Sequence, residues 1–207
     1  MTDYTAIYET AESLAALFRR DMTPEPIAKA EQIGLCEPQE PEDNQLTIWI
    51  YNVEEIKETG PRAGYMPDPV DPSLERYAPL QIKLHVLVSA HSKAAAMQKY
   101  ADRYRIIGRA MQLVRDNPSI PRECLHGTLA EQNEPVTLEL QKLNVEELSR
   151  IWNNSNKTMV PSFGLTISQV FIKSNRVRPA ASRVTTAEFD TRQKGTKPPQ
   201  NGRRPGL

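Results

Sequence analysis

The chain has few cysteines, the residues that cross-link small domains through disulfides. Only two of its 207 residues, Cys36 and Cys124, are cysteines. Two thiols cannot form a disulfide framework or, by themselves, a zinc site, and free thiols in a reducing cytosol are the default interpretation. The sequence also lacks any run of about 18 apolar residues, so no membrane-spanning helix is expected. The N-terminus has no early basic residue before an apolar run, so we expect no secretory signal peptide.

The chain also lacks an excess of charge of one sign, because 26 basic residues balance 26 acidic ones. A neutral chain is poorly suited to coat DNA, where affinity comes mainly from neutralising phosphates. The balance, however, is uneven along the chain. Residues 176–207 carry eight basic and two acidic residues, a net +6, which leaves residues 1–175 at −6. Few large apolar residues occur in this tail, so we expect it to be disordered or to fold only on a partner.

Glycine is also scarce, at 9 residues against 17 prolines, and five of the prolines fall in residues 54–79. Proline fixes φ and removes an N–H donor, so this stretch cannot be a regular helix or a central strand. We expect a long proline-rich loop. Loops of this length inside a domain are usually functional or disordered.

Four helices are predicted from apolar spacing and from start and stop residues. They cover residues 4–21, a short segment between Thr23 and Gly34, residues 93–116, and a turn that Asn144 caps and that ends near Asn153. The third helix is predicted to be amphipathic, with a stripe through Met97, Tyr100 or Ala101, Tyr104, Ile107, Met111 and Val114.

Four strands are predicted between these helices. Residues 80–90 alternate strictly between apolar and polar side chains, which indicates a half-buried strand. Residues 46–53 look covered on both faces, and two more strands fall near residues 136–140 and 163–171. The order of elements predicts an α/β (α+β) fold: a single domain over residues 1–175 with a four-stranded mixed sheet flanked by helices, followed by an extended arm over residues 176–207.

The chemistry-bearing residues do not form a recognisable catalytic or metal-binding pattern. His85 and His91 have no metal-site spacing, and His126 lies two residues from Cys124 in a loop that we expect to turn at Gly127. Phosphate-binding, nucleophile-elbow and zinc-protease motifs do not occur. We therefore expect no catalytic residue, no cofactor and no metal, and the chain is not predicted to be an enzyme.

Four segments occur in an order and spacing that resemble a known family: LTIWIYNVEE, PLQIKLHVLVSAHS, RIIGRAMQLVRDNP and VTLELQKLNVEELSRIW. The family is that of the tail-terminator, or cap, proteins of extracellular contractile injection systems, which include the Photorhabdus virulence cassettes and the antifeeding prophage. The most specific parts are Gly108–Gln112 and the segment that ends at Trp152. The resemblance covers about residues 3–175, so the tail inherits no role from it.

The resemblance implies a structural role. Six copies would form a ring that ends the inner tube and holds the last sheath ring, with self, tube protein and sheath protein as partners and neither nucleic acid nor membrane insertion expected. Assembly would be cytoplasmic, in a particle that is later released or stays anchored. We expect the loop to contact the ring or tube through Arg62, Tyr65 and Met66. We expect the arm to contact the sheath through Arg178, Arg183, Val184, Phe189 and Arg192.

Other interpretations remain open from the sequence. An adaptor between the tube or sheath end and the cap of the same particle would share these features. Interpretations of a different class are a cytosolic ligand-binding domain or enzyme and a nucleic-acid-binding accessory protein that uses the basic tail. A steep salt dependence of DNA affinity would support the last of these.

Overall fold

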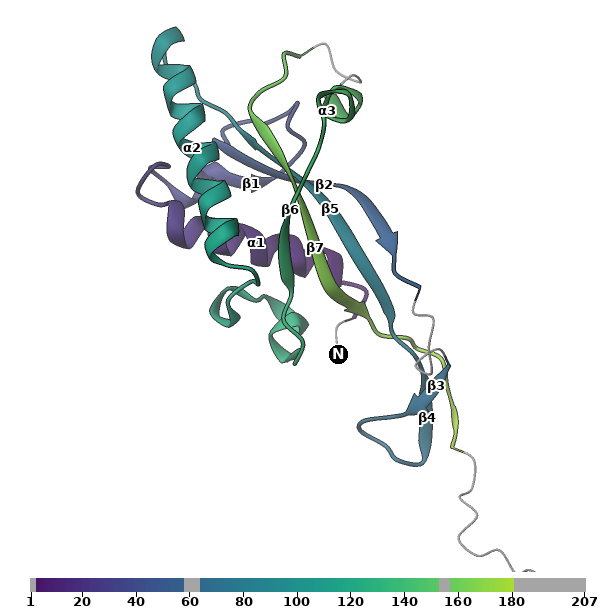
Figure 1. Ribbon diagram of the computed structural model, residues 1–207. Coiled ribbons are helices and arrows are strands. Elements are labelled where there is room, and N and C mark those ends of the chain that lie inside the picture. Colours follow the sequence, from purple (N-terminus) through teal and green to yellow (C-terminus); the bar gives the residue numbers. More distant parts are fainter. Residues whose placement is uncertain (1–2, 58–63, 153–156, 181–207) are drawn as a thin grey trace, which may run out of the picture.

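The computed structural model of the chain describes residues 3–57, 64–152 and 157–180 (Figure 1). Its main feature is a five-stranded sheet with the order β1-β2-β5-β7-β6. The strands are β1 (Ile33–Leu35), β2 (Leu46–Glu55), β5 (Leu80–Ala90), β6 (Thr137–Gln141) and β7 (Ser162–Ile172). β1 is parallel to β2 and every other neighbouring pair is antiparallel, so the sheet is mixed as predicted. All four predicted strands are present, and β1 is a fifth that the sequence did not predict.

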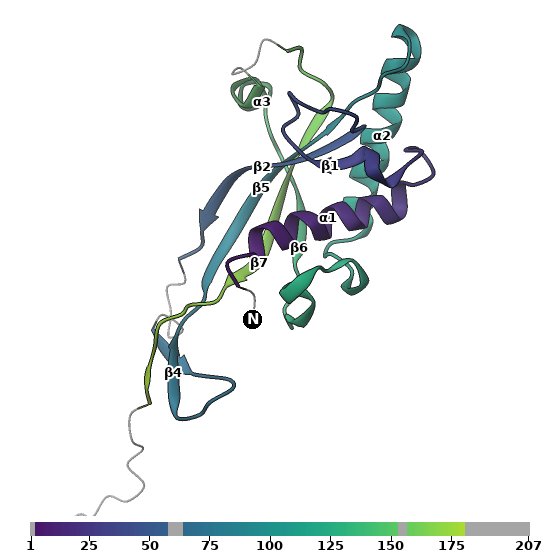
Figure 2. The same cartoon turned by 180° about the vertical axis from the view of Figure 1, so that it is seen from behind.

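Helices α1 (Ala6–Met22) and α2 (Ala96–Asp116) lie on one face of this sheet (Figures 1 and 2). Leu14, Leu17 and Phe18 recur at intervals of three and one along α1 and are fully buried against the strands. From the sheet, Ile82, Leu84, Val86 and Val88 of β5 enter the same core. The alternation predicted for residues 80–90 is therefore confirmed over most of the strand, and apolar burial of this kind is the main stabilising contribution to the domain.

The other face of the sheet carries a smaller hydrophobic cluster beneath α3 (Val145–Trp152). Leu87 and Trp152 are buried there, and Trp49 and Tyr51 of β2 pack against them. The predicted cover on both faces is therefore confirmed for residues 46–51, but it is wrong at the end of the predicted stretch 46–53, where Val53 is 44% exposed. The predicted helix cap is also confirmed: Asn144 Oδ1 accepts from the Glu147 N–H at 2.8 Å, and the Glu147 carboxylate accepts from the Asn144 N–H at 2.9 Å.

The prediction of a short helix between Thr23 and Gly34 is wrong. The structure has only a 3-10 turn at Ala30–Gln32, which leads directly into β1. Pro26 disfavours the helical φ/ψ region for Glu25, the residue before it, so a helix that begins at Pro24 is disrupted within its first turn.

The interior stripe predicted for the third helix is also largely wrong. The buried residues of α2 are Ile106, Ala110, Leu113 and Val114. Met97, Tyr100 and Tyr104 are instead exposed, at 92%, 56% and 60% of their surface. The helix is apolar on two sides, and only one of them faces the core.

The proline-rich stretch 54–79 is not a loop throughout. β2 runs to Glu55, and two short strands follow, β3 (Tyr65–Pro67) and β4 (Leu74–Tyr77). With β8 (Val177–Pro179) they form a second sheet of order β3-β4-β8, here called the small sheet. The prolines permit this because Pro67 and Pro179 lie at strand ends, where a missing ladder donor costs little.

Candidate functional site

The small sheet lies beyond one end of the five-stranded sheet, where β5 begins and β7 ends (Figures 1 and 2). β4 is joined to β5 by Ala78 and Pro79 alone, and residues 173–176 join β7 to β8. Both neighbouring pairs in the small sheet are antiparallel. The proline-rich segment and the start of the C-terminal arm, far apart in sequence, thus meet in one structure.

Three of the predicted contact residues come together here. Tyr65 and Met66, predicted as loop contacts, lie on β3, and Arg178, predicted as an arm contact, lies on β8. The guanidinium carbon of Arg178 is 4.1 Å from the centre of the Tyr65 ring, a cation–π distance. Arg178 also forms an ion pair with Glu75 of β4 at 2.7 Å. The loop and the base of the arm therefore form one surface.

A second aromatic–cation pair extends this surface toward the five-stranded sheet. The Tyr65 and Tyr77 rings meet edge to face with centroids 5.3 Å apart. Arg176 lies over Tyr77 with its guanidinium carbon 5.4 Å from the ring centre, and its carbonyl oxygen accepts from the Tyr77 N–H at 2.9 Å. Tyrosine and arginine are enriched where proteins meet other proteins, so this surface is a candidate for assembly contacts.

The turn between β3 and β4 is held by the buried carboxylate of Asp68. Its oxygens accept from the N–H groups of Val70 at 2.9 Å and Asp71 at 3.2 Å, and from Arg76 Nε at 2.7 Å. These interactions, led by the Val70 bond, lower the pKa of Asp68 despite its desolvation. Arg76 Nη1 in turn donates to the Ser174 carbonyl at 2.9 Å, which ties the hairpin to the segment entering β8.

The remaining predicted residues lie outside the described part of the chain. Arg62 falls in residues 58–63, and Arg183, Val184, Phe189 and Arg192 fall in residues 181–207. Their contacts stay predictions.

Several site residues were not predicted from the sequence: Asp68, Glu75, Arg76, Tyr77 and Arg176. One local signal was present, since Asp68 precedes a turn that ends at a second aspartate, Asp71. This signal does not reveal that the arm returns to pair with the hairpin.

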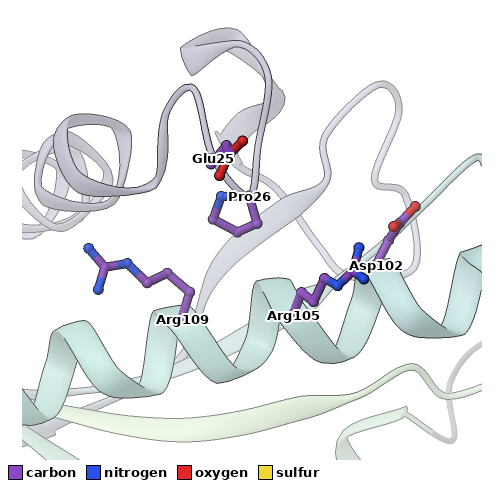
Figure 3. Close-up of a pocket in the computed structure, with 5 residues that line it drawn as sticks. All are labelled: Glu25, Pro26, Asp102, Arg105 and Arg109. Atoms are coloured by element: carbon purple, nitrogen blue, oxygen red, sulfur yellow. The ribbon is translucent and has the colours of Figure 1, made fainter.

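Two open pockets lie on the described surface. One, of about 540 Å³, lies between α2 and the segment after α1 and is lined by Glu25, Pro26, Asp102, Arg105 and Arg109 (Figure 3). Arg109 Nη2 donates to the Asp21 carbonyl at 3.2 Å at its margin. The other, of about 480 Å³, lies where the two sheets join, and its cations are Lys57, Lys173 and Arg176. Both pockets are lined by charged groups.

The thiols and imidazoles do not assemble into a reactive site in the described residues. Burial raises the pKa of the Cys124 thiol, and Gly127 turns the following loop with φ +56°, as the sequence predicted. Within residues 3–57, 64–152 and 157–180 no group of three His, Cys, Asp or Glu side chains could hold a metal ion. No helix among these residues is long and apolar enough to cross a membrane.

Comparison with known proteins identifies the family. The sequence profile of the Pvc16 N-terminal domain matches residues 9–186, which include the five-stranded sheet and all of the small sheet. No curated protein matches the chain. Among solved structures, the fold is similar to the sheath/tube terminator in the extended state of PVC, an extracellular contractile injection system, with a TM-score of 0.64 and 13% identity. The match covers 94% of this chain and 66% of that one, so this chain spans just under two thirds of the solved protein. The chain therefore belongs to the Pvc16 N-terminal domain family.

Proposed function

We propose that this protein is the sheath/tube terminator of a contractile injection particle, a structural component without catalysis. The observation that carries the proposal is the family match over residues 9–186, which spans both sheets. The shared fold with a solved sheath/tube terminator supports it.

In this proposal six copies form a closed ring on the end of the inner tube and hold the last ring of the sheath. Such a ring uses head-to-tail interfaces, which close only at the right rotation. The predicted tube or ring contacts Tyr65 and Met66 lie on β3, at the free edge of the small sheet, which makes them available to a neighbour. The ring assembles in the cytoplasm and becomes part of a particle that is released or anchored.

The C-terminal arm is proposed to reach the sheath as an added strand. β8 is the outer strand of the small sheet, so one of its edges has no neighbouring strand among the described residues. Unpaired strand edges are templates for pairing with another chain. The Arg178 contacts to Glu75 and Tyr65 hold β8 on the small sheet. Residues near 180–192, with Arg183 and Arg192, then meet acidic groups on a sheath subunit.

Imaging of particles made with and without this protein tests the proposal. Particles that lack it should have tubes and sheaths of irregular length, while particles that contain it should end in a uniform sixfold cap. Tube and sheath ends that stay regular in its absence would contradict a terminator role.

The arm is tested by ending the chain at Ala180, because removing residues 177–207 would also delete β8. The Ala180 N–H donates to the Ser73 carbonyl at 2.8 Å, so this shorter truncation keeps the small sheet closed. The truncated protein should still form rings but should lose its hold on the sheath end. Unchanged sheath attachment would contradict the role of the arm.

A further inference from the structure

The first half of α2 buries no side chain. α2 has 21 residues, and its four buried ones, Ile106, Ala110, Leu113 and Val114, all lie in the second half. In both views its amino-terminal end extends past the edge of the sheet (Figures 1 and 2). A helical segment of about ten residues is marginal in water without tertiary packing. The amino-terminal half therefore lacks the packing that normally stabilises a helix, and a partner surface would supply it.

The exposed side of α2 is apolar along its length. Met97, Tyr100, Tyr104 and Met111 are 92%, 56%, 60% and 39% exposed and follow each other at intervals of three, four and seven residues. These intervals place them on one helix face, here called the α2 stripe. Met111 lies 14 positions after Met97, so the stripe is about 21 Å long. Tyrosine and methionine are enriched in the cores of protein interfaces, whereas an isolated exposed apolar residue means little.

Gly108 lies on the same face, between Tyr104 and Met111. A Cβ atom built at this position would meet no atom within 4 Å, so nothing in the described chain requires glycine there. Glycine in a helix interior lowers helix stability relative to alanine, but it lets another backbone approach closely. A glycine in the middle of an exposed apolar stripe fits a surface that another chain covers.

The net positive charge of α2 favours an acidic partner surface. α2 carries five basic residues and only two acidic ones, although residues 1–175 as a whole have a net charge of −6. On the opposite face of the sheet, α3 begins with three exposed residues, Val145, Glu146 and Glu147. A head-to-tail ring joins two different surfaces of neighbouring subunits, so the α2 side of one copy can meet the α3 side of the next. We infer that the α2 stripe receives the exposed start of α3 from a second copy of this chain, an inference that rests on the proposed ring.

The first test replaces Tyr100 and Tyr104 together by glutamate and measures mass in solution by light scattering and native mass spectrometry. Both side chains are exposed in the single chain, so circular dichroism and melting temperature should stay unchanged. The double variant should need a protein concentration at least about tenfold higher to form the ring, because assembly would bury two charges. Tyr8→Glu, at an exposed tyrosine of α1, is the matched control and should assemble as the unmodified protein does.

The second test addresses the α3 side with Glu146→Arg, which places a positive charge opposite the basic helix. Ring formation should again shift to higher concentration. Glu131→Arg, an equally drastic reversal at an exposed position in the 3-10 turn before β6, should leave assembly unchanged. Glu147 is left intact because it caps α3.

The outcomes separate the inference from the function on which it rests. An unmodified protein that stays monomeric alone and with tube and sheath proteins would overturn the ring and, with it, the terminator proposal. A ring that persists in the double tyrosine variant would overturn only the role of the α2 stripe. If that ring no longer captures tube or sheath protein, the stripe binds that protein instead. A stripe variant that dissociates while Glu146→Arg still forms the ring would overturn the α3 assignment.

Discussion

The two sheets are stabilised by different forces. The five-stranded sheet lies between helices, and fully buried side chains such as Leu14, Phe18 and Leu84 fill its core. In the small sheet no strand residue belongs to either hydrophobic cluster. It is stabilised by backbone pairing, by the Arg76–Asp68 and Arg178–Glu75 ion pairs and by arginine–tyrosine contacts.

Because of this difference, the five-stranded sheet is hard to rearrange, whereas the contacts of the small sheet can be replaced. Apolar burial is insensitive to salt and hard to rearrange, because cores are close-packed. Of the contacts in the small sheet, the Arg178–Glu75 ion pair and the cation–π contacts are more exposed than the buried Arg76–Asp68 pair. Exposed contacts contribute little individually, and exposed ion pairs are screened by salt, so they can be exchanged for similar contacts on another chain. The five-stranded sheet is thus suited to fix the shape of a subunit, and the small sheet is suited to exchange partners.

The largest effect is expected in the main core. Replacing Phe18 by alanine removes a fully buried side chain from α1 and should lower the free energy of unfolding by about 3 to 5 kcal/mol. Urea denaturation followed by circular dichroism measures the loss. Tyr8→Ala on the same helix is 64% exposed and should cost less than about 0.5 kcal/mol. Equal losses in the two variants would contradict the assignment of the buried face.

Acid should lower the free energy of unfolding of the part of the chain built on the five-stranded sheet, through His91. Burial is the main cause that lowers the pKa of His91 to about 4, and the positive charge of Arg103 lowers it further. The unfolded chain, with a pKa near 6.5, then binds this proton more readily, so stability is full above about pH 6.5 and falls as the pH drops toward 4. The loss attributable to His91 should be on the order of 3 kcal/mol.

His91→Gln separates this effect from other titrations, because glutamine keeps a polar group near Thr47, whose Oγ1 is 3.3 Å from His91 Nε2. The free energy of unfolding, measured across this pH range, should depend less on pH in the variant than in the unmodified protein. Parallel pH curves for the two proteins would show that His91 is not the sensitive group.

In the small sheet, Arg76→Ala should have a smaller and purely local effect. The substitution removes the ion-pair partner of the buried Asp68 carboxylate and the hydrogen bond to the Ser174 carbonyl. It should lower the free energy of opening of the small sheet by about 1 kcal/mol. Hydrogen exchange should accelerate at the Tyr77 amide and stay unchanged at Val86 in β5. Arg122→Ala, at an exposed arginine elsewhere, is the control. Faster exchange in both sheets would mean that they open as one unit.

The smallest effect should come from Arg178→Ala, since Arg178 is largely exposed. We expect less than about 1 kcal/mol, again confined to the small sheet. Raising salt to about 1 M should shrink the difference between this variant and the unmodified protein, because the ion pair with Glu75 is then screened. A difference that survives high salt would show that the stacking on Tyr65 dominates.

The sequence predicted the long strands well because their alternation extends over many residues. Residues 80–90 and 163–171 have enough positions for a period of two to be recognised, and Asn144 caps α3 through a local motif. β1, β3 and β8 have three residues each, which is too short for any period. Their pairing depends on contacts between segments distant in the chain, which local patterns do not encode.

The site was predicted only in part for the same reason. Tyr65 and Arg178 were candidates, but their sequence separation hid the fact that they stack on each other. The inward face of α2 was missed for a different reason. Both Ile106 and Tyr104 belong to apolar stripes, and a single helix pattern cannot tell a side that packs on its own sheet from one that is exposed.

The connections between the two sheets have a mechanical consequence. β4 continues into β5 after two residues, and β7 continues into β8 after four. The small sheet is therefore connected to two adjacent inner strands of the five-stranded sheet. A pull on the C-terminal arm is shared between them, because β8 is paired with β4. The load then runs along the length of β5 and β7, whose hydrogen bonds resist it in shear rather than opening one at a time from an edge. The small sheet would therefore transmit tension from a moving neighbouring subunit to β5 and β7, while the five-stranded sheet and its helices keep their shape.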